Sequence, residues 1–454
     1  MKSSFRIALL CGAVVSALGV SSTAFAGGRP DLVLAGLKAG RAHQADELLV
    51  KYRDGTSAVQ QSSARQAFGL QKIETLRGGN GKRGELALMR VPAGRDLAAT
   101  VYELSKDPSV EYAEPNWQYQ HQTASNDTYY TNGSLWGMYG SGSTPANPYG
   151  SQAAVAWAGG HTDCSNVVVG IIDEGYMYSH PDLAANAWTN PYDPVDGVDN
   201  DGNGYIDDVH GWDFEGVNNE VFDGAGDDHG THVAGTIAGA GGNGQGVAGV
   251  CWSGVKLISG KFLGRRSGST ADAIKAIDYF NDLKSRHGLN IVATNNSWGG
   301  GGFSQALQDA IGRANTAGIL FVVAAGNAGV NCETSDCYPA EYPNPNVLSV
   351  TALRSDGSQI YSYGSTTIDI GAPGYGIWST VPVSSKGQVV PSYASYNGTS
   401  MATPHVTGAV ALYASSHPGA TAADIKSAIM SSAIATPSLS GKTVSGGRLN
   451  ASGF

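Results

Sequence analysis

At 454 residues the chain exceeds one average domain, and its net charge of −10 leaves no broad basic surface for nucleic acid. With 41% hydrophobic and 15% charged residues, the composition is that of a folded protein and excludes an intrinsically disordered one. We therefore expect a globular protein without a nucleic-acid partner, whose acidic surface is compatible with cation sites.

The N-terminus has the pattern of a secretory signal peptide over residues 1–26. Lys2 and Arg6 flank the start of an apolar run from Ile7 to Val20, and the small residues of a cleavage site follow at Ala24-Phe25-Ala26. The alternative, a buried or membrane helix, is disfavoured because the run is short. No later segment approaches the ~20 continuous apolar residues of a spanning helix. We therefore expect a secreted, extracellular protein that leaves the membrane once the signal is removed.

Four cysteines follow the signal peptide, at Cys164, Cys251, Cys332 and Cys337. An even number in an exported chain favours disulfides, for which three pairings are possible. Cys332 and Cys337 lie close together in a polar loop, whereas Cys164 and Cys251 each shortly precede a predicted strand. We therefore favour the pairs Cys164–Cys251 and Cys332–Cys337 over free buried thiols.

Residues 27–122 are predicted to form a small α+β unit. The order of its elements is β-α-β-β-α-β, which is typical of a ferredoxin-like fold. These elements are strands at 48–52, 73–76, 86–91 and 110–116 and helices near 63–68 and 97–104. Residues 27–45 show no clear periodicity, and residues 121–150, rich in Ser, Thr, Asn, Gly and Tyr, are interpreted as a linker.

Residues 123–454 are predicted to form an α/β domain with a mainly parallel sheet and helices on both faces, because strands and helices alternate. The run from Val167 to Ile172 is apolar throughout, as a strand covered on both faces requires. Further predicted strands cover 255–262, 291–295, 319–325 and 347–353. Two amphipathic stripes, over 274–283 and 307–314, predict helices between them.

Two motifs place a carboxylate and an imidazole near the edge of this sheet. Asp173 ends the apolar strand, where ligand sites form in open α/β sheets, although Asp at a strand end is also a common turn residue. His229 begins a helix that is rich in Gly and Ala and can pack closely on the sheet. Together with His232 it could bind a metal, but the glutamate of an HExxH zinc site is absent. His232 is therefore interpreted as a core residue.

A third motif, from Asn397 to Val406, exposes Ser400 at the start of a predicted helix. Pro404 is tolerated there because the amides of the first helical turn have no intrahelical acceptor. Ser400 could be a simple helix cap, but the helix N-terminus also favours developing negative charge near its hydroxyl.

These motifs are ambiguous one by one, yet they occur in the order Asp, His, Ser, which is the order in subtilisin. The chain resembles the subtilisin-like serine peptidases over residues 126–450, and residues 47–120 resemble their inhibitory propeptide. The resemblance implies that Asp173, His229 and Ser400 form a catalytic triad. It also implies that the side-chain amide of Asn327 stabilises the oxyanion together with the backbone N–H of Ser400.

Substrate contacts are likewise implied by the resemblance, at Ser297, Trp298, Gly299 and Gly268. The glycines leave backbone exposed, so a peptide can pair with it as an added strand. Trp298 departs from the smaller aliphatic residue of the family, which reshapes the expected specificity pocket. The Cys332–Cys337 loop precedes Tyr338-Pro339-Ala340, the segment that forms the floor of that pocket in the family.

An acidic insertion suggests a structural calcium site at Asp199, Asp201, Asn203 and Asp207. The D-x-D-x-N-G spacing sets oxygen side chains around a tight turn, as calcium loops require. The loop is not a complete EF-hand, since His210 occupies the position of the final glutamate. A solvated acidic loop is the alternative, but clustered carboxylates without a cation would repel one another.

The sequence as a whole predicts a secreted, monomeric serine endopeptidase that cleaves proteins and peptides and is made as a self-processing zymogen inhibited by its own propeptide. A catalytically inactive relative would lack at least one of four residues, Asp173, His229, Asn327 or Ser400, and all four are present. An acid-active relative with a carboxylate in place of the histidine is disfavoured by His229. The side-chain preference and the physiological substrate stay open.

Overall fold

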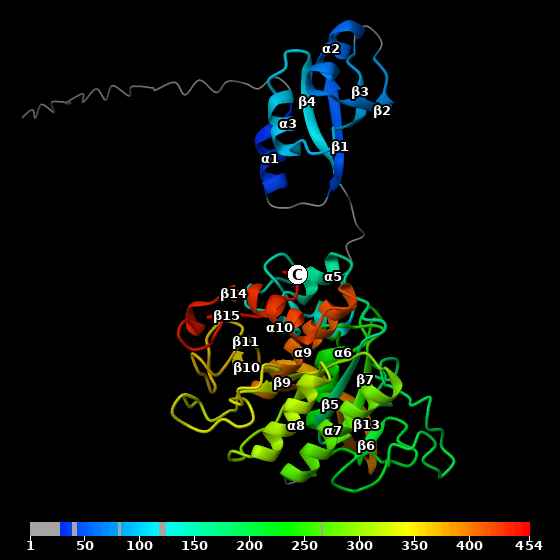
Figure 1. Ribbon diagram of the computed structural model, residues 1–454, viewed down its shortest axis with the longest axis vertical. Helices are drawn as coiled ribbons and strands as arrows, with labels where there is room; N and C mark the ends of the chain where they lie inside the picture. The colour runs from blue at the N-terminus through cyan, green and yellow to red at the C-terminus, as the bar shows by residue number, and fades with distance from the viewer. Residues whose placement is uncertain (1–27, 39–42, 80–82, 118–123, 265–266) are drawn as a thin grey trace, which may run out of the picture. The chain divides into compact units, whose positions relative to one another are not determined.

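The computed structural model describes residues 28–38, 43–79, 83–117, 124–264 and 267–454. The chain divides into two compact units, Met1–Gln120 and His121–Phe454 (Figure 1). The predicted signal peptide and the predicted boundary near residue 122 lie outside the described residues, so both stay predictions. Within the described ranges, no helix combines the length and the apolar character needed to span a bilayer.

The first unit is a four-stranded antiparallel sheet with the strand order β2-β3-β1-β4. Its successive elements are β1 (His43–Tyr52), α2 (Ala58–Phe68), β2 (Gln71–Arg77), β3 (Leu86–Arg90), α3 (Leu97–Leu104) and β4 (Val110–Trp117). Leu48, Val50, Met89 and Val101 are fully buried in its single core. The predicted ferredoxin-like arrangement is therefore confirmed.

One helix of this unit, α1 (Pro30–Lys38), was not predicted. It packs against α3 and β4, and Val33, Leu34 and Leu37 contact the core while remaining partly exposed. With nine residues, one of them Gly36, the helix is shorter than the window of about 11–18 residues over which a helical period can be recognised in a sequence.

The second unit is built on a nine-stranded sheet with the order β14-β15-β11-β10-β9-β8-β5-β7-β6. All neighbours pair in parallel except β14 and β15. The strands are β5 (Val168–Asp173), β6 (Gly211–Asp213), β7 (Lys256–Lys261), β8 (Ile291–Asn296), β9 (Leu320–Ala324), β10 (Val347–Leu353), β11 (Ile370–Pro373), β14 (Ile434–Ala435) and β15 (Gly447–Arg448). The predicted mainly parallel sheet is confirmed.

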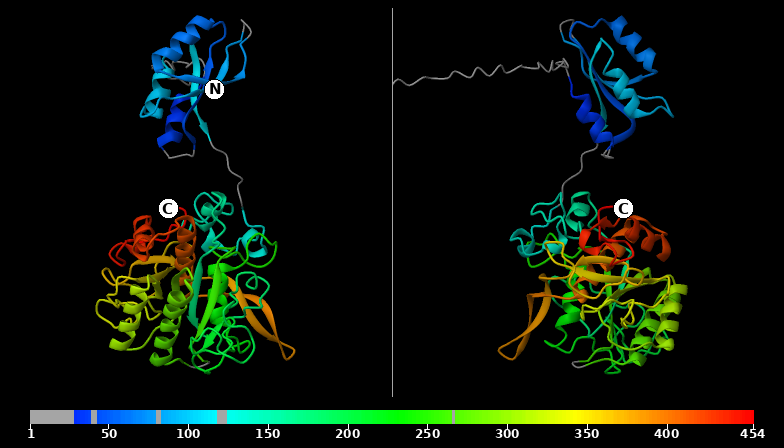
Figure 2. Two further views of the ribbon diagram at one scale, coloured as in Figure 1. Left: turned by 45° about the vertical axis from the view of Figure 1, so that its right-hand side comes forward. Right: turned by 90° about the vertical axis from the view of Figure 1, so that its left-hand side faces the viewer.

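Helices cover both faces of this sheet, as Figure 2 shows. In β9, Leu320 and Val322 belong to the core beneath α6 (Asp228–Ala238) and α9 (Thr399–Ser416), whereas Phe321 and Val323 belong to the core beneath α7 (Thr270–His287) and α8 (Gln305–Thr316). Successive residues must all be apolar when both faces of a strand are buried. This explains the continuous apolar runs in the sequence.

The linker interpretation of residues 121–150 is wrong for the described part, 124–150. This segment contains α4 (Thr128–Thr131) and a 3₁₀ turn (Trp136–Met138), and it leads into α5 (Ala153–Ala158). Tyr130 is 3% exposed, and its ring lies 5.8 Å from that of Trp157 in the core. The aromatic residues anchor a polar segment whose elements are too short to show a period.

The long hairpin of β12 (Ile377–Ser385) and β13 (Gln388–Tyr396) was also not predicted. Its base packs on α6, and its far end extends away from the rest of the unit (Figure 2). The last long helix, α10 (Ala422–Ser431), packs against α9.

Both favoured disulfides are present. The Cα atoms are 6.1 Å apart in Cys164–Cys251 and 5.6 Å apart in Cys332–Cys337. The first bond joins the segments that lead into β5 and β7, at the amino ends of these parallel strands.

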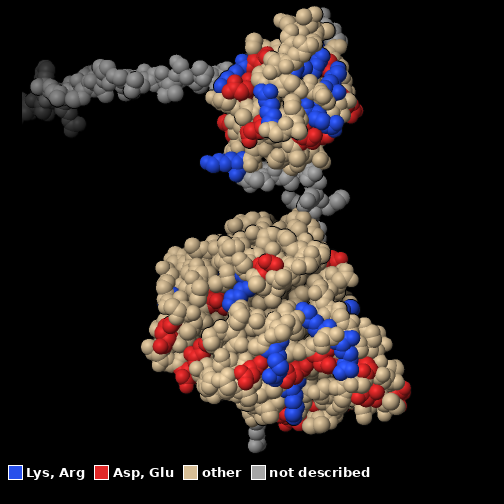
Figure 3. All heavy atoms as spheres, viewed as in Figure 1, with Lys and Arg blue, Asp and Glu red and all other residues tan. Residues whose placement is uncertain are grey.

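Charged side chains of both signs are mixed on the surface. On the face drawn in Figure 3, the Lys and Arg side chains of each unit lie among Asp and Glu side chains. No continuous basic patch is visible on that face.

Candidate active site

One strand and two helices bring the predicted catalytic side chains to the edge of the sheet at which the parallel strands end. Asp173 is the last residue of β5, His229 is the second residue of α6, and Ser400 is the second residue of α9. Gly175 and Gly230 allow β5 and α6 to approach closely, since a Cβ atom on Gly230 would lie 2.0 Å from the Gly175 carbonyl oxygen. Gly175 itself has φ +94°, a left-handed conformation that favours glycine.

Asp173 and His229 are joined by a hydrogen bond of 2.8 Å between Oδ1 and Nδ1. Asp173 is fully buried, and the same oxygen accepts the backbone N–H of Glu174 at 2.9 Å. Burial alone would lower the pKa of His229, but the charge and hydrogen bond of Asp173 outweigh it and raise that pKa to about 9. The carboxylate thus fixes the ring orientation and stabilises the imidazolium.

Ser400 and Ser297 exchange two hydrogen bonds that tie α9 to the end of β8. Ser400 Oγ donates to the Ser297 carbonyl oxygen at 3.0 Å, and Ser297 Oγ donates to the Ser400 carbonyl oxygen at 2.9 Å. Among the described residues, no hydrogen bond links Ser400 to His229. The Ser400 hydroxyl is therefore hydrogen-bonded to the Ser297 carbonyl beside the cleft. It has to rotate away from that carbonyl to reach the His229 imidazole.

Asn327 lies directly beside the start of α9. Its Oδ1 accepts the Thr399 backbone N–H at 2.8 Å and the Thr399 hydroxyl at 3.0 Å. Because the carbonyl end of this amide is held in place, the NH₂ group is directed away from it and is available to donate. Asn327 is exposed to solvent, so a ligand can reach that group.

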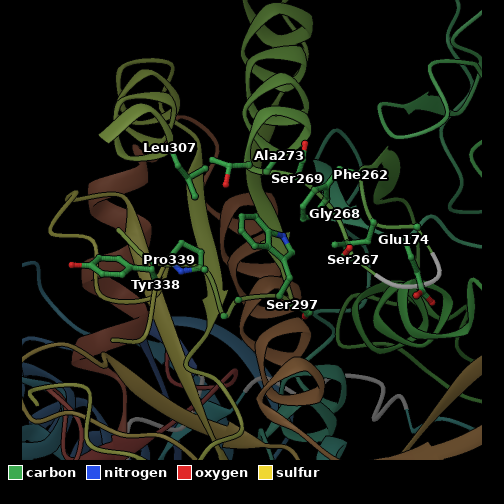
Figure 4. A pocket seen from close by; sticks show the side chains of 18 of the residues that line it. Glu174, Phe262, Ser267, Gly268, Ser269, Ala273, Ser297, Leu307, Tyr338 and Pro339 are labelled. Carbon is green, nitrogen blue, oxygen red and sulfur yellow. The ribbon is translucent and has the colours of Figure 1, made fainter. Parts of the chain in front are cut away.

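A cleft of about 680 Å³ runs beside these residues (Figure 4). All four predicted substrate-binding residues, Ser297, Trp298, Gly299 and Gly268, line it, as does His229. In Figure 4, Ser267, Gly268 and Ser269 lie across the cleft from Tyr338 and Pro339. Asp173, Ser400 and Asn327 lie next to the cleft without lining it.

The structure adds apolar wall residues that sequence reasoning missed, namely Phe262, Leu263, Ala273 and Leu307. The Trp298 ring packs edge-on against Phe262, with ring centroids 4.9 Å apart. Glu174, which also lines the cleft, could have been noticed as the acidic residue directly after Asp173.

His232 lies in the core as predicted. It is fully buried, and its Nε2–H donates to the Ile377 carbonyl oxygen at 2.8 Å. Burial lowers the pKa of His232 to about 3, so the ring stays neutral. A metal-binding role together with His229 is not supported by this geometry.

The predicted calcium residues share one loop but do not all converge. Oδ1 of Asp199 and Oδ1 of Asp201 both accept the Asn203 backbone N–H, at 3.1 and 3.0 Å. The Asp207 carboxylate instead accepts the amides of Asp196 and Gly197, both at 3.0 Å. No cluster of three or more His, Cys, Asp or Glu side chains suited to a metal occurs in the described ranges. The fit to calcium thus rests on two carboxylates and neutral oxygens.

Comparison with known proteins decides the family. The model described as "Subtilase family" matches residues 164–454, which is more than half of the chain. The chain belongs to the subtilase family. The model described as "Fervidolysin N-terminal prodomain" matches residues 33–116 of this subtilase, within its first unit.

Relatives of this subtilase support the same conclusion. An extracellular protease of Xanthomonas campestris is 33% identical over 96% of this chain and 76% of its own length. Subtilisin E of Bacillus subtilis is 35% identical over 73% of this chain and 72% of its own. The solved structure of a Pseudoalteromonas arctica protease matches with a TM-score of 0.55 and 28% identity, covering 73% of this chain and 98% of its own. The chain is a subtilisin-like serine protease with a prodomain.

Proposed function

We propose that Asp173, His229 and Ser400 are the catalytic triad of this subtilase, and that it cleaves peptide bonds through an acyl-enzyme on Ser400. One observation carries the assignment. His229 lines the cleft while its Nδ1 is bonded to the buried Asp173, and Ser400 is hydrogen-bonded to the cleft residue Ser297. A nucleophile, a base and a group that orients the base thus meet at one cleft.

In the first half-reaction, Ser400 Oγ attacks the peptide carbonyl carbon as its proton passes to His229 Nε2. Asp173 stabilises the imidazolium that forms. When the tetrahedral intermediate collapses, the C–N bond breaks and His229 gives its proton to the leaving amine. Water then attacks the ester by the same route and releases the acid and the free Ser400 hydroxyl.

The oxyanion of each intermediate is proposed to accept two hydrogen bonds, one from Asn327 Nδ2 and one from the Ser400 backbone N–H. The bonds between Asn327 Oδ1 and Thr399 support this role, because they fix which end of the amide faces outward. The amide is thus oriented before charge develops, which is the condition for strong electrostatic stabilisation.

Replacing the nucleophile tests the assignment. Ser400→Ala in the full chain is expected to lower casein hydrolysis by roughly a million-fold, because triad members act as one unit. The same variant is expected to stay unprocessed on a gel. Ser416→Ala, at the other end of the same helix, is the matched control and should process and hydrolyse normally. Self-processing by Ser400→Ala would show that another residue is the nucleophile.

We propose that the acidic loop binds calcium through Asp199, Asp201 and Asn203, and that Asp207 braces the loop through the amides of Asp196 and Gly197. The convergence of two carboxylate oxygens on one N–H supports this set. Hard cations prefer such carboxylate and amide oxygens. The ion would hold the insertion in one conformation.

The calcium proposal predicts a lower melting temperature in chelator, measured on inactive Ser400→Ala protein so that self-digestion does not interfere. Asp199→Asn should melt at that lower temperature whether or not calcium is added, whereas Asp309→Asn, on the exposed face of α8, should respond as the parent does. A melting temperature that is independent of calcium in the parent rules the site out.

We further propose that residues 1–26 direct export, that residues 27–122 inhibit the enzyme until self-cleavage, and that the mature protease is a monomer without a nucleic-acid partner. The extracellular protease among its relatives and the prodomain match support export and inhibition. The N-terminal sequence and native mass of the protein from culture medium test these points. The N-terminal sequence should begin after residue 122, and the native mass should be that of a single chain.

A further inference from the structure

The carboxylate of Glu174 holds the backbone amide of His229. Glu174 Oε1 accepts the His229 N–H at 2.6 Å, and Glu174 lines the substrate cleft beside the imidazole. This N–H belongs to the first turn of α6, where amides have no partner within the helix. A side chain from the end of β5 therefore supplies the acceptor that the helix itself lacks.

Glu174 is itself fixed at two further points. Its backbone N–H donates to Asp173 Oδ1 at 2.9 Å, and its carbonyl oxygen accepts a hydrogen bond from Lys261 Nζ. The Lys261 side chain is 2% exposed and is paired with Asp227 at 3.0 Å and Asp223 at 3.3 Å. Asp227 immediately precedes α6. Glu174 thus joins the strand that carries Asp173 to the helix that carries His229.

The surroundings of Glu174 are mostly acidic. Asp173 lies on β5, and Asp228 and His229 lie on α6. The hydroxyl of Tyr396, on β13, donates a hydrogen bond to the Asp228 carboxylate. Lys261, on β7, approaches from the side of the backbone. Burial, followed by the charge of Asp173, raises the pKa of Glu174 to about 7, and a charged Glu174 in turn raises the pKa of His229. The protonation state of Glu174 therefore affects the pKa of His229, and that of His229 affects the pKa of Glu174.

We propose that Glu174 is a positioning residue for His229: its hydrogen bond fixes the imidazole beside Asp173, and its charge sets the pH at which the enzyme becomes active. The inference rests on the proposed role of His229 as general base. A neutral imidazole is needed to accept the serine proton. A charged Glu174 favours the imidazolium, so it moves the rise of activity to higher pH.

Two substitutions separate the hydrogen bond from the charge. Glu174→Gln keeps an oxygen that can accept the His229 N–H but carries no charge. It should move the acid limb of kcat/KM down by about one pH unit and leave the kcat plateau within about two-fold, since a nearby opposite charge accounts for a shift of that size. Glu174→Ala leaves the amide without its acceptor and should lower the kcat plateau by about ten-fold at a nearly unchanged KM.

The pH profiles are measured with a soluble peptide substrate on the mature enzyme, and rates are normalised to sites titrated with a fluorophosphonate. Glu220→Gln, which removes an exposed carboxylate, is the matched control. Its kcat/KM should rise with pH over the same range as in the parent enzyme. An unchanged acid limb in Glu174→Gln overturns the proposal, and so does an unchanged plateau in Glu174→Ala. If the alanine variant does not mature, the glutamine profile decides alone.

Comparison of these pH profiles with the separate Ser400→Ala test distinguishes this inference from the proposed function. If Ser400→Ala abolishes hydrolysis while Glu174→Gln keeps the parent profile, the triad stands and only the role of Glu174 fails. If Ser400→Ala still hydrolyses peptide, the triad assignment fails, whatever Glu174 does.

Discussion

The oxygen and the NH₂ group of the Asn327 side chain have different roles, and a single substitution distinguishes them. Asn327→Asp keeps the oxygen that Thr399 binds but replaces the NH₂ donor by an anion. Because the donor acts only on the oxyanion, kcat should fall by at least about 10²–10³-fold while KM stays nearly constant. Steady-state kinetics on titrated sites measure both. The matched control is Asn315→Asp, on the exposed face of α8, and equal losses in both variants would contradict the oxyanion role.

At the scale of single residues, the order of the motifs along the chain indicated the family, which the chemistry of each side chain alone could not do. Asp173, His229 and Ser400 are each ambiguous, and their order along the chain suggested the family before any geometry was known. The hydrogen bond from Ser400 Oγ to the Ser297 carbonyl could not be predicted, since a hydroxyl rotamer depends on tertiary neighbours. The bond between Glu174 and the His229 amide escaped prediction for the same reason.

The Cys332–Cys337 loop controls one wall of the cleft, because Tyr338 and Pro339 follow it directly and line the cleft. Replacing both cysteines by serine should lower the free energy of unfolding by about 2 kcal/mol, the entropy of closing so short a loop. KM should rise several-fold and kcat should hold, since no triad residue is in the loop. Denaturant unfolding of an inactive background and peptide kinetics measure the two effects.

The disulfide between Cys164 and Cys251 gives the matched comparison. Cys164 and Cys251 are 87 positions apart in the sequence, and their disulfide lies at the amino ends of β5 and β7, at the opposite edge of the sheet from the triad. Replacing both of its cysteines should cost more stability, about 4–5 kcal/mol, but leave KM unchanged. If KM rises equally in both double variants, loosening of the whole domain, and not of the cleft wall, explains the first result.

Elements were predictable where burial imposes a pattern. β5 and β9 are buried at every position, and both were recognised as apolar runs. The hairpin of β12 and β13 was missed because every residue of β13 is exposed or half-buried, which removes the apolar signal. The segment around Tyr130 was missed because its fold depends on a few aromatic contacts with distant residues such as Trp157.

At the scale of the whole molecule, the sheet of the protease unit requires contacts between distant parts of the chain. β5 pairs with both β7 and β8, and β11 pairs with β15 near the end of the chain. Such non-local pairing is slow, because loop-closure entropy is lost before the contacts form. The first unit has its own buried core and a simple antiparallel sheet, so it can fold early.

We therefore expect the first unit to speed the refolding of the protease unit. Denatured mature protease should recover little activity alone and substantially more when the separate first unit is added, as measured by peptide hydrolysis after the added unit has been digested. The matched control is the first unit with Val101→Asp, which places a charge at a fully buried position and should unfold it. Equal recovery with the intact unit, the unfolded unit or no addition would mean that the parallel sheet assembles without a template, and that the first unit acts on the finished enzyme alone.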